Sequence, residues 1–139
     1  MEEYNLNRFV DAQDKVFDTV LKELRVGRKE SHWMWFVFPQ LKELGRSRMG
    51  EYYGIENIEE ARAYLAHPVL GERLEKCFQI LLDLKISNPV RIFGVDHQKL
   101  HSCATLFLIA APENELFQRV IDKFWGVTEY ETENILKKG

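Results

Sequence analysis

The sequence has few of the residues that cross-link or interrupt a chain, and it has no long apolar run. Its 139 residues include two cysteines, Cys77 and Cys103, and four prolines. Both cysteines fall in apolar helical runs and no CxxC pair exists, so we predict two buried thiols in a reducing compartment. No apolar run approaches the roughly 20 residues that a membrane helix needs, and the first residues, MEEYNLNRF, are too acidic and polar for a signal peptide. We therefore predict a cytoplasmic protein that uses no membrane.

Other absences argue against several classes of function. The chain lacks GxGxxG, GxxxxGK followed by Ser or Thr, and GxSxG, which disfavours the common dinucleotide, P-loop and serine-hydrolase sites. His97 and His101 have the i, i+4 spacing of metal ligands, but no HExxH pattern and no obvious third ligand accompany them. We therefore expect no metal and no cofactor. The formal net charge of −3, with no recognisable zinc finger or helix-turn-helix, disfavours nucleic acid as a partner.

The clearest positive signal is apolar residues at helical spacing. They recur from Leu6 to Leu24, with Asn5 or Asn7 as a candidate cap and Gly27 as a candidate stop. Asn57 with Glu60, Asp96, and Thr128 with Glu131 are the predicted caps of three later helices. The longer elements after the first are predicted at residues 57–66, 68–82, 96–111, 116–124 and 128–136.

These elements predict an all-α fold. No convincing alternation of apolar and polar residues indicates a strand of useful length. No linker, repeat or low-complexity segment divides the chain, and the connections are short. We therefore predict a compact multihelical single domain over residues 1–139, with about seven to nine short helices.

The most unusual segment is SHWMWFVFPQL at residues 31–41. It lies within residues 22–48, where seven Lys and Arg residues outnumber three Glu residues. Cations around flat aromatic rings suit a ligand that carries a planar ring and a phosphate or carboxylate. On a short helix Trp33 and Trp35 point in different directions, so one indole can be core while the other lines a surface. The alternative is that all the aromatic residues are core and the cations form a solvated rim.

Several strings together resemble a known family, the uncharacterised family called domain of unknown function 1810. The resemblance covers nearly the whole length and rests on these motifs: Phe9-x-x-x-Gln13, Gly27-x-Lys29, Ser31-His32-Trp33-Met34-Trp35-x-x-Phe38-Pro39-Gln40, Leu44-Gly45-x-Ser47, Tyr64-Leu65-x-His67-Pro68-Val69-Leu70 with Arg73, Ile92-Phe93-Gly94, Lys99-Leu100 and Thr105-Leu106-Phe107. It implies a mainly α-helical single domain and no established activity. The "calpastatin" label that some members carry suits a disordered inhibitor, whereas this composition is globular. Asp96-His97 and His101-Ser102-Cys103-Ala104 depart from the usual pattern of the family.

The polar residues of these motifs supply the candidate site. Gln13 and Ser102 fall on or beside predicted apolar faces, where a polar group needs a partner. We predict that Lys29, Arg73 and Lys99 meet the negative charge of a ligand, and that Trp33 or Trp35 stacks on its ring. We predict that His32 orients the ligand or moves a proton. The full set of predicted ligand-binding residues is Lys29, Trp33, Trp35, Gln40, Ser47, Arg73, Lys99, Ser102 and Gln13, with His32 as the candidate catalytic residue.

The predicted function is the binding of a small anionic or nucleotide-like ligand, with catalysis on it left open. The alternative, from a different class, is a protein–protein interaction module that exposes an aromatic face and has no enzymatic activity. A third interpretation places all of the residue 32–35 segment in the core and the function elsewhere.

Overall fold

A computed structural model of the protein describes residues 4–138. Within that range the prediction of an all-α fold is confirmed: nine α-helices of five residues or more, one four-residue helix and two 3₁₀ turns, and no strand beyond an isolated bridge. No helix in this part of the chain is both long and apolar enough to cross a membrane. The elements are α1 (Asn7–Asp14), α2 (Phe17–Val26), α3 (Met34–Val37), η1 (Lys42–Leu44), α4 (Arg48–Tyr52), α5 (Ile58–Ala66), α6 (Leu70–Asp83), α7 (Pro89–Phe93), η2 (Gly94–Asp96), α8 (His97–Ala110), α9 (Glu115–Phe124) and α10 (Tyr130–Lys138).

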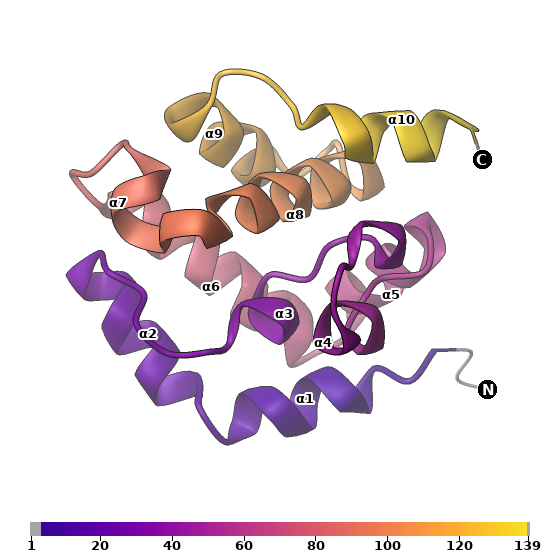
Figure 1. Ribbon diagram of the computed structural model, residues 1–139, viewed down its shortest axis with the longest axis horizontal. Coiled ribbons are helices and arrows are strands. Elements are labelled where there is room, and N and C mark those ends of the chain that lie inside the picture. The colour runs from indigo at the N-terminus through magenta and orange to yellow at the C-terminus, as the bar shows by residue number, and fades with distance from the viewer. Residues whose placement is uncertain (1–3, 139) are drawn as a thin grey trace.

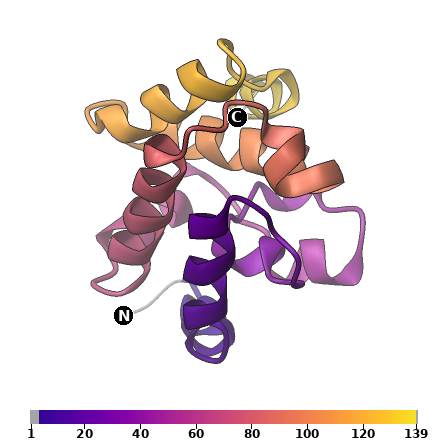
Figure 2. The same ribbon diagram turned by 90° about the vertical axis from the view of Figure 1, so that its left-hand side faces the viewer.

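Helix α8 lies in the middle of the molecule and packs against α5, α9 and α10 (Figure 1). It suits this position because no residue from Leu100 to Ala110 is exposed, and most of them are apolar. Figure 2 shows the C-terminal helices on one side of the molecule and the N-terminal helices on the opposite side. Aromatic rings connect the layers: Phe38 stacks on Phe78 at 5.4 Å between centroids, and Phe78 meets Phe117 edge-on at 5.2 Å. The core therefore runs without interruption from α3 through α6 to α9.

The first predicted helix is wrong in one respect, because it is two helices rather than one. Val16, between α1 and α2, has φ −135° and ψ 2°, which is not helical backbone. Neither Asn5 nor Asn7 caps α1, whose N-cap is Leu6 with no side-chain bond. Gly27 ends α2 as predicted, with a left-handed φ of 84°. The apolar periodicity did not reveal the break at Val16, because both helices bury their apolar residues against the same core.

The predicted caps of the later helices were partly right. Asn57 caps α5, since its side-chain oxygen accepts the Glu60 amide at 2.9 Å. Asp96 precedes α8 but makes no cap bond, because its carboxylate pairs with two lysines instead. Glu129, rather than Thr128, caps α10 by accepting the Thr132 amide at 2.9 Å.

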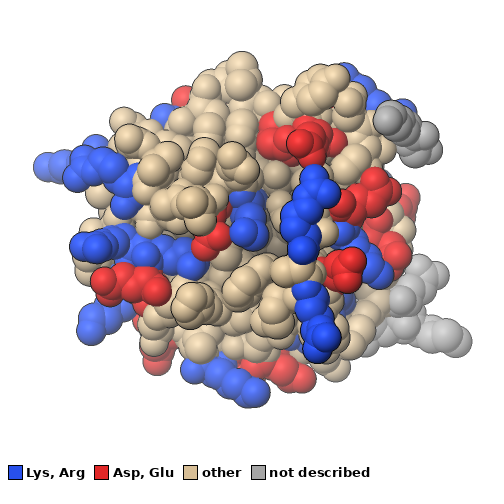
Figure 3. All heavy atoms as spheres, viewed as in Figure 1, with Lys and Arg blue, Asp and Glu red and all other residues tan. Residues whose placement is uncertain are grey.

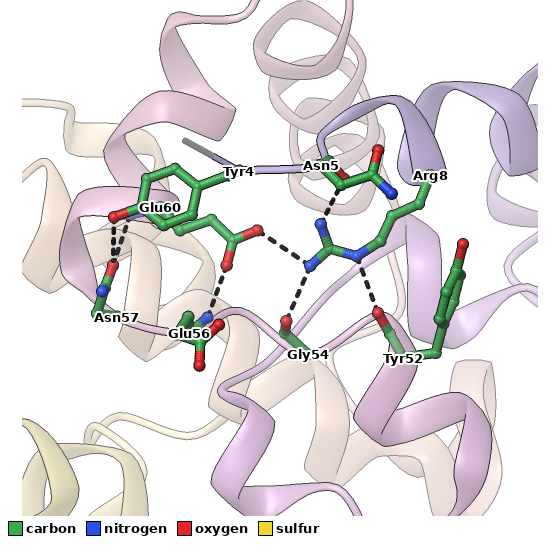
Figure 4. A network of polar contacts seen from close by, with 8 residues as sticks. All are labelled: Tyr4, Asn5, Arg8, Tyr52, Gly54, Glu56, Asn57 and Glu60. Atoms are coloured by element: carbon green, nitrogen blue, oxygen red, sulfur yellow. Dashed lines mark hydrogen bonds and ion pairs between the residues drawn. The ribbon is translucent and has the colours of Figure 1, made fainter. Parts of the chain in front are cut away.

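Arg8 fixes the chain between α4 and α5 to α1, as Figure 4 shows. Its guanidinium donates to the backbone oxygens of Tyr52 at 2.8 Å and Gly54 at 3.0 Å, and to the Glu60 carboxylate at 3.0 Å. Both charged side chains of this ion pair are almost fully buried. A buried, fully bonded ion pair holds its geometry tightly, because breaking one partner strands the other.

A short parallel bridge between Leu41 and Ile55 continues this attachment. The Ile55 amide donates to the Gln40 oxygen at 2.9 Å, and the Lys42 amide donates to the Ile55 oxygen at 2.8 Å. Residues 40–50 are therefore held firmly against the body of the fold, where they form one wall of a cleft.

Candidate functional site

A cleft of about 790 Å³ opens between residues 40–50, the start of α8 and the connection from α9 to α10. Figure 3 shows a hollow on this face of the molecule, bordered by both basic and acidic side chains. The volume lies within the range of small-molecule sites, which is roughly 300–1,000 Å³. The three segments that form it are far apart in the sequence.

Five of the ten predicted site residues line this cleft: Trp35, Gln40, Ser47, Lys99 and Ser102. Ser47 also caps α4, since its hydroxyl accepts the Gly50 amide at 3.1 Å. Ser102 donates its hydroxyl to a Glu129 carboxylate oxygen at 3.1 Å. These two hydroxyls thus support the walls as well as facing the cavity.

Three other predicted residues lie away from the cleft and bind partners within the protein. Gln13 is buried and donates to the Phe36 backbone oxygen at 2.6 Å and the Tyr64 hydroxyl at 3.0 Å. Arg73 pairs with Asp14 at 2.8 Å. Lys29 lies 3.1 Å from Asp96 and is also almost fully buried. The negative charges that Lys29 and Arg73 meet are therefore carboxylates of the protein itself.

Trp33 belongs to the core. It is 0% exposed, and its indole N–H donates to Glu23 at 2.9 Å. Glu23 also accepts the Glu30 and Ser31 amides, at 2.8 and 3.0 Å. Burial raises the pKa of this carboxyl, but the bonds from Ser31, Glu30 and Trp33 lower it by more, to about 2. Trp33 thus offers no surface for stacking.

The candidate catalytic residue His32 is exposed and does not line the cleft. It follows the Glu23 network directly, so its backbone is held while its ring faces solvent.

Two cationic residues line the cleft, Arg46 in the wall of residues 40–50 and Lys99 near the start of α8. Lys99 lies 3.1 Å from Asp96, which it shares with Lys29. Burial raises the pKa of Asp96, but the two lysines lower it by more, so this carboxyl stays ionised. Arg46 is exposed and makes no ion pair with any residue in the range 4–138.

The cleft is also lined by aromatic side chains from α8 and the α9–α10 connection. The His101 imidazole stacks on the Trp125 indole, with centroids 4.2 Å apart and planes 2° from parallel. Nε2 of His101 lies 2.7 Å from the Val127 oxygen. Burial lowers the pKa of His101, while that bond and Glu129 raise it by less, so the neutral ring is favoured. Sequence reasoning weighed His97 and His101 as metal ligands and did not single out Trp125.

Two polar atoms of residues that line the cleft have no hydrogen-bond partner among residues 4–138. They are Nδ1 of His97 and Nε1 of Trp125, and both are shielded from solvent. More than about 90% of buried polar groups in proteins are paired, so two unpaired atoms are unusual. In the same part of the chain, no three His, Cys, Asp or Glu side chains gather as a metal site requires.

Glu129 attaches α10 to α8 at the rim of the cleft. Its backbone amide donates to the Thr105 hydroxyl at 2.9 Å, and its carboxylate accepts from Ser102 and Thr132. Burial raises the pKa of Glu129, but bonds from Thr132, Glu131 and Ser102 lower it by more. The Glu129 carboxylate is therefore already hydrogen-bonded within the protein, and these polar bonds hold this wall of the cleft in place.

Comparison with known proteins identifies a family and a fold but no activity. The model of a family described as a protein of unknown function, DUF1810, matches residues 3–136. The crystal structure of the conserved hypothetical protein Rv1873 from Mycobacterium tuberculosis is similar, with a TM-score of 0.95 and 43% identity. That similarity covers 98% of this chain and 99% of the other. No curated protein matches the chain.

Proposed function

The chain belongs to the DUF1810 family of proteins of unknown function, and we propose that its cleft binds a small nucleotide-like ligand, with a planar ring and an anionic group such as phosphate. The observation that carries this proposal is an exposed arginine, Arg46, that has no ion pair among residues 4–138 and lines a cavity of about 790 Å³ together with three aromatic side chains, Trp35, His101 and Trp125.

The cationic residues of the cleft suit the anionic group. Arg46 has no carboxylate partner among residues 4–138, so its guanidinium is available to a ligand. Guanidinium binds phosphate or carboxylate through two parallel hydrogen bonds, which makes it the preferred partner for such groups. Lys99 adds a second cation whose own partner, Asp96, is also neutralised by Lys29.

The aromatic side chains of the cleft suit the ring. Trp35, His101 and Trp125 supply flat surfaces there, on which a planar ligand packs well. Gln40 lies on the same cavity and offers an amide for a further polar contact. This arrangement gives no role to His32, Trp33, Arg73 or Gln13 in binding.

The alternative of a protein interaction module has less support. Of the large apolar residues that are most exposed, Val95 and Tyr130 line the cleft itself, Val127 contacts the cleft residue His101, and Val26 stands alone on α2. An interaction site for a protein usually needs a contiguous exposed apolar patch. The exposed apolar residues here belong mostly to a concave cleft, which favours a small ligand over a protein partner.

We also propose that the protein works in the cytoplasm. Both cysteines are buried and unbridged. Burial raises the pKa of the Cys77 thiol to about 12 and raises that of Cys103 well above its usual value. Such thiols are structural rather than reactive, and a chain whose cysteines stay unbridged is typical of a reducing compartment. Expression of a fluorescent fusion in the native host tests the location.

Binding is tested by thermal shift and calorimetry with inorganic phosphate, ribose 5-phosphate, AMP and ADP-ribose. A probe at about 100 times its Kd stabilises the fold by roughly 2.7 kcal/mol, which moves Tm by several degrees. We expect a ring-bearing phosphate to bind best and Arg46→Ala to weaken it about tenfold or more, because a charge-assisted bond is lost.

Arg48→Ala is the matched control, since Arg48 is an exposed neighbour of Arg46 that does not line the cleft. We expect this variant to bind like the wild type. The proposal fails if no probe binds at millimolar concentration, or if Arg46→Ala and Arg48→Ala weaken binding equally.

A further inference from the structure

We propose that Glu131 binds the sugar hydroxyls of the ligand while Arg46 binds its anionic group, so that the cleft selects a ribonucleotide over a nucleotide whose sugar lacks hydroxyls. This inference rests on the proposed function and adds to it a specificity-determining carboxylate. It is carried by two exposed side chains of opposite charge that line the same cavity and have no ion-pair partner among residues 4–138.

Four Lys, Arg and Glu side chains line the cleft, and two of them already have partners within the fold. The Lys99 ammonium lies 3.1 Å from Asp96. The Glu129 carboxylate accepts the Ser102 hydroxyl at 3.1 Å and the Thr132 amide at 2.9 Å. Much of the bonding capacity of this cation and this anion is therefore used inside the protein.

The other two charged side chains, Arg46 and Glu131, are exposed. The backbone amide of Glu131 donates to a Glu129 carboxylate oxygen at 2.7 Å, but the Glu131 carboxylate forms no ion pair with any residue in the range 4–138. Arg46 likewise forms none, so the two residues do not neutralise each other. One cavity thus presents a cation and an anion that a ligand can meet separately.

Arg46 and Glu131 belong to different walls of the cleft. Arg46 lies between η1 and α4, and Glu131 lies in the first turn of α10. The chain next to Glu131 is fixed, because Glu129 bonds to Ser102 and Thr105 of α8. Acidic and basic side chains both border the hollow in Figure 3. A ligand that contacts both charges therefore spans the cleft from one anchored wall to the other.

The chemistry of Glu131 decides which part of the ligand it meets. A carboxylate only accepts hydrogen bonds, so the ligand group beside it is a donor. A bare phosphate gains no bond from Glu131 and is repelled by it, since charges interact over roughly 10 Å at 0.1 M salt. The ribose of a nucleotide carries two neighbouring hydroxyls between its phosphate and its base, and a carboxylate accepts from such hydroxyls. A ribonucleotide can thus meet Arg46, Glu131 and the aromatic side chains together.

Calorimetry with AMP and 2′,3′-dideoxy-AMP tests the assignment, because these probes share the base and the phosphate and differ only in the hydroxyls. We expect the wild type to bind AMP about tenfold more tightly, the factor that corresponds to 1.4 kcal/mol, because bonds to a charged group are lost in the analogue. Glu131→Ala should reduce this preference to less than about threefold. Circular dichroism confirms that the variant is folded.

Glu133→Ala is the matched control. Glu133 lies two residues further along α10 and does not line the cleft, so this variant removes the same charge from the same helix. It should keep the preference for AMP. Inorganic phosphate adds a test of sign: Glu131→Ala should bind it at least as tightly as the wild type does, since the variant loses a repelling charge and no bond.

A ligand with an ammonium group is a second source of donors for a carboxylate, and phosphoethanolamine is the probe for it. If phosphoethanolamine binds more tightly than AMP and Glu131→Ala abolishes that advantage, the donor is an amine and the assignment to sugar hydroxyls is overturned. We expect phosphoethanolamine to bind more weakly than AMP, because it has no ring for the aromatic side chains of the cleft.

The outcomes separate this inference from the proposed function. If phosphate probes bind in an Arg46-dependent way, but AMP has no advantage over its dideoxy analogue, the inference is overturned and the proposed function stands. The same holds if the advantage survives Glu131→Ala or is lost equally in Glu133→Ala. If no probe binds in an Arg46-dependent way, both are overturned. An advantage that is lost in Glu131→Ala and kept in Glu133→Ala supports both.

Discussion

Trp33 and Trp125 place the same indole N–H group in two different surroundings. That of Trp33 donates to Glu23 at 2.9 Å, in a core where the carboxylate also accepts two backbone amides. That of Trp125 is also shielded from solvent but has no partner among residues 4–138. The region around Glu23 uses every strong donor that it buries and so acts as a support. Burial of the Trp125 donor is therefore not compensated by a bond to any described residue, so its removal should cost the fold little.

Removal of Glu23 should have the largest effect on stability, since it strands several buried donors at once. We expect Glu23→Ala to lower the free energy of unfolding by about 3 kcal/mol or more, because each donor left unpaired costs roughly 1–3 kcal/mol. Urea unfolding measures the change. Glu30→Ala is the control, because Glu30 is exposed and its side chain makes no described bond; its effect should stay within about 0.5 kcal/mol. Equal effects would remove the support role from Glu23.

Acid pH should weaken the same region. The folded pKa of Glu23 is about 2 against an ordinary value of 4.5. The stability that this difference contributes is present above pH 4.5 and is lost as the pH falls towards 2, up to about 3 kcal/mol. Unfolding free energies at pH 6, 4 and 3 should therefore converge for the wild type and Glu23→Gln. A constant gap between them contradicts the assignment.

Replacement of each indole by phenyl compares the two tryptophans directly. Trp33→Phe loses a buried hydrogen bond and leaves a cavity, so we expect a cost of about 2 kcal/mol. Trp125→Phe loses no bond to the described residues and removes an unpaired donor, so its cost should stay below about 1 kcal/mol. Thermal and urea unfolding of both variants give the values. Equal costs would show that Trp125 is as structural as Trp33.

The smallest effect is expected from His101 near neutral pH. Burial lowers its pKa from 6.5, so the unfolded chain takes up a proton at a higher pH than the folded one. Stability should therefore fall as the pH drops below about 6.5, in a range where Glu23 stays ionised. The Tm of the wild type and His101→Gln between pH 7.5 and 5.5 measures this. An identical decrease in both assigns it to other groups.

The features that the sequence predicted well depend on residues three or four apart. The cap of α5 joins Asn57 to the Glu60 amide, and the end of α2 needs only the left-handed backbone of Gly27. Such signals are local, so they survive without knowledge of the fold. The cap of α10 shows the limit: Thr128 and Glu129 are both suitable acceptors, and contact with Thr105 and Ser102 of α8 selects Glu129.

The cleft was harder to predict because tertiary packing creates it. Trp35 and Ser47 were found through their motif, but the motif does not show that they face His97 and Trp125. Trp33 and Trp35 are chemically equivalent in the sequence, and only the fold shows that Trp33 is the buried indole, bonded to Glu23 of α2. The role of a cation is equally hard to predict from the sequence, because it depends on which carboxylate lies nearby in the fold. Lys29 forms an ion pair with Asp96 and so does not need a ligand as its partner.

The bond between Glu23 and Trp33 also has a consequence for isotope exchange. A buried proton held in a hydrogen bond exchanges with deuterium only when the surrounding structure opens. Trp33 is 0% exposed and packs against Phe38 in the main core, so its indole proton is released only when that core separates. The exchange rate of this single proton therefore reports the global opening of the protein, free of the local fraying that dominates at helix ends and in loops.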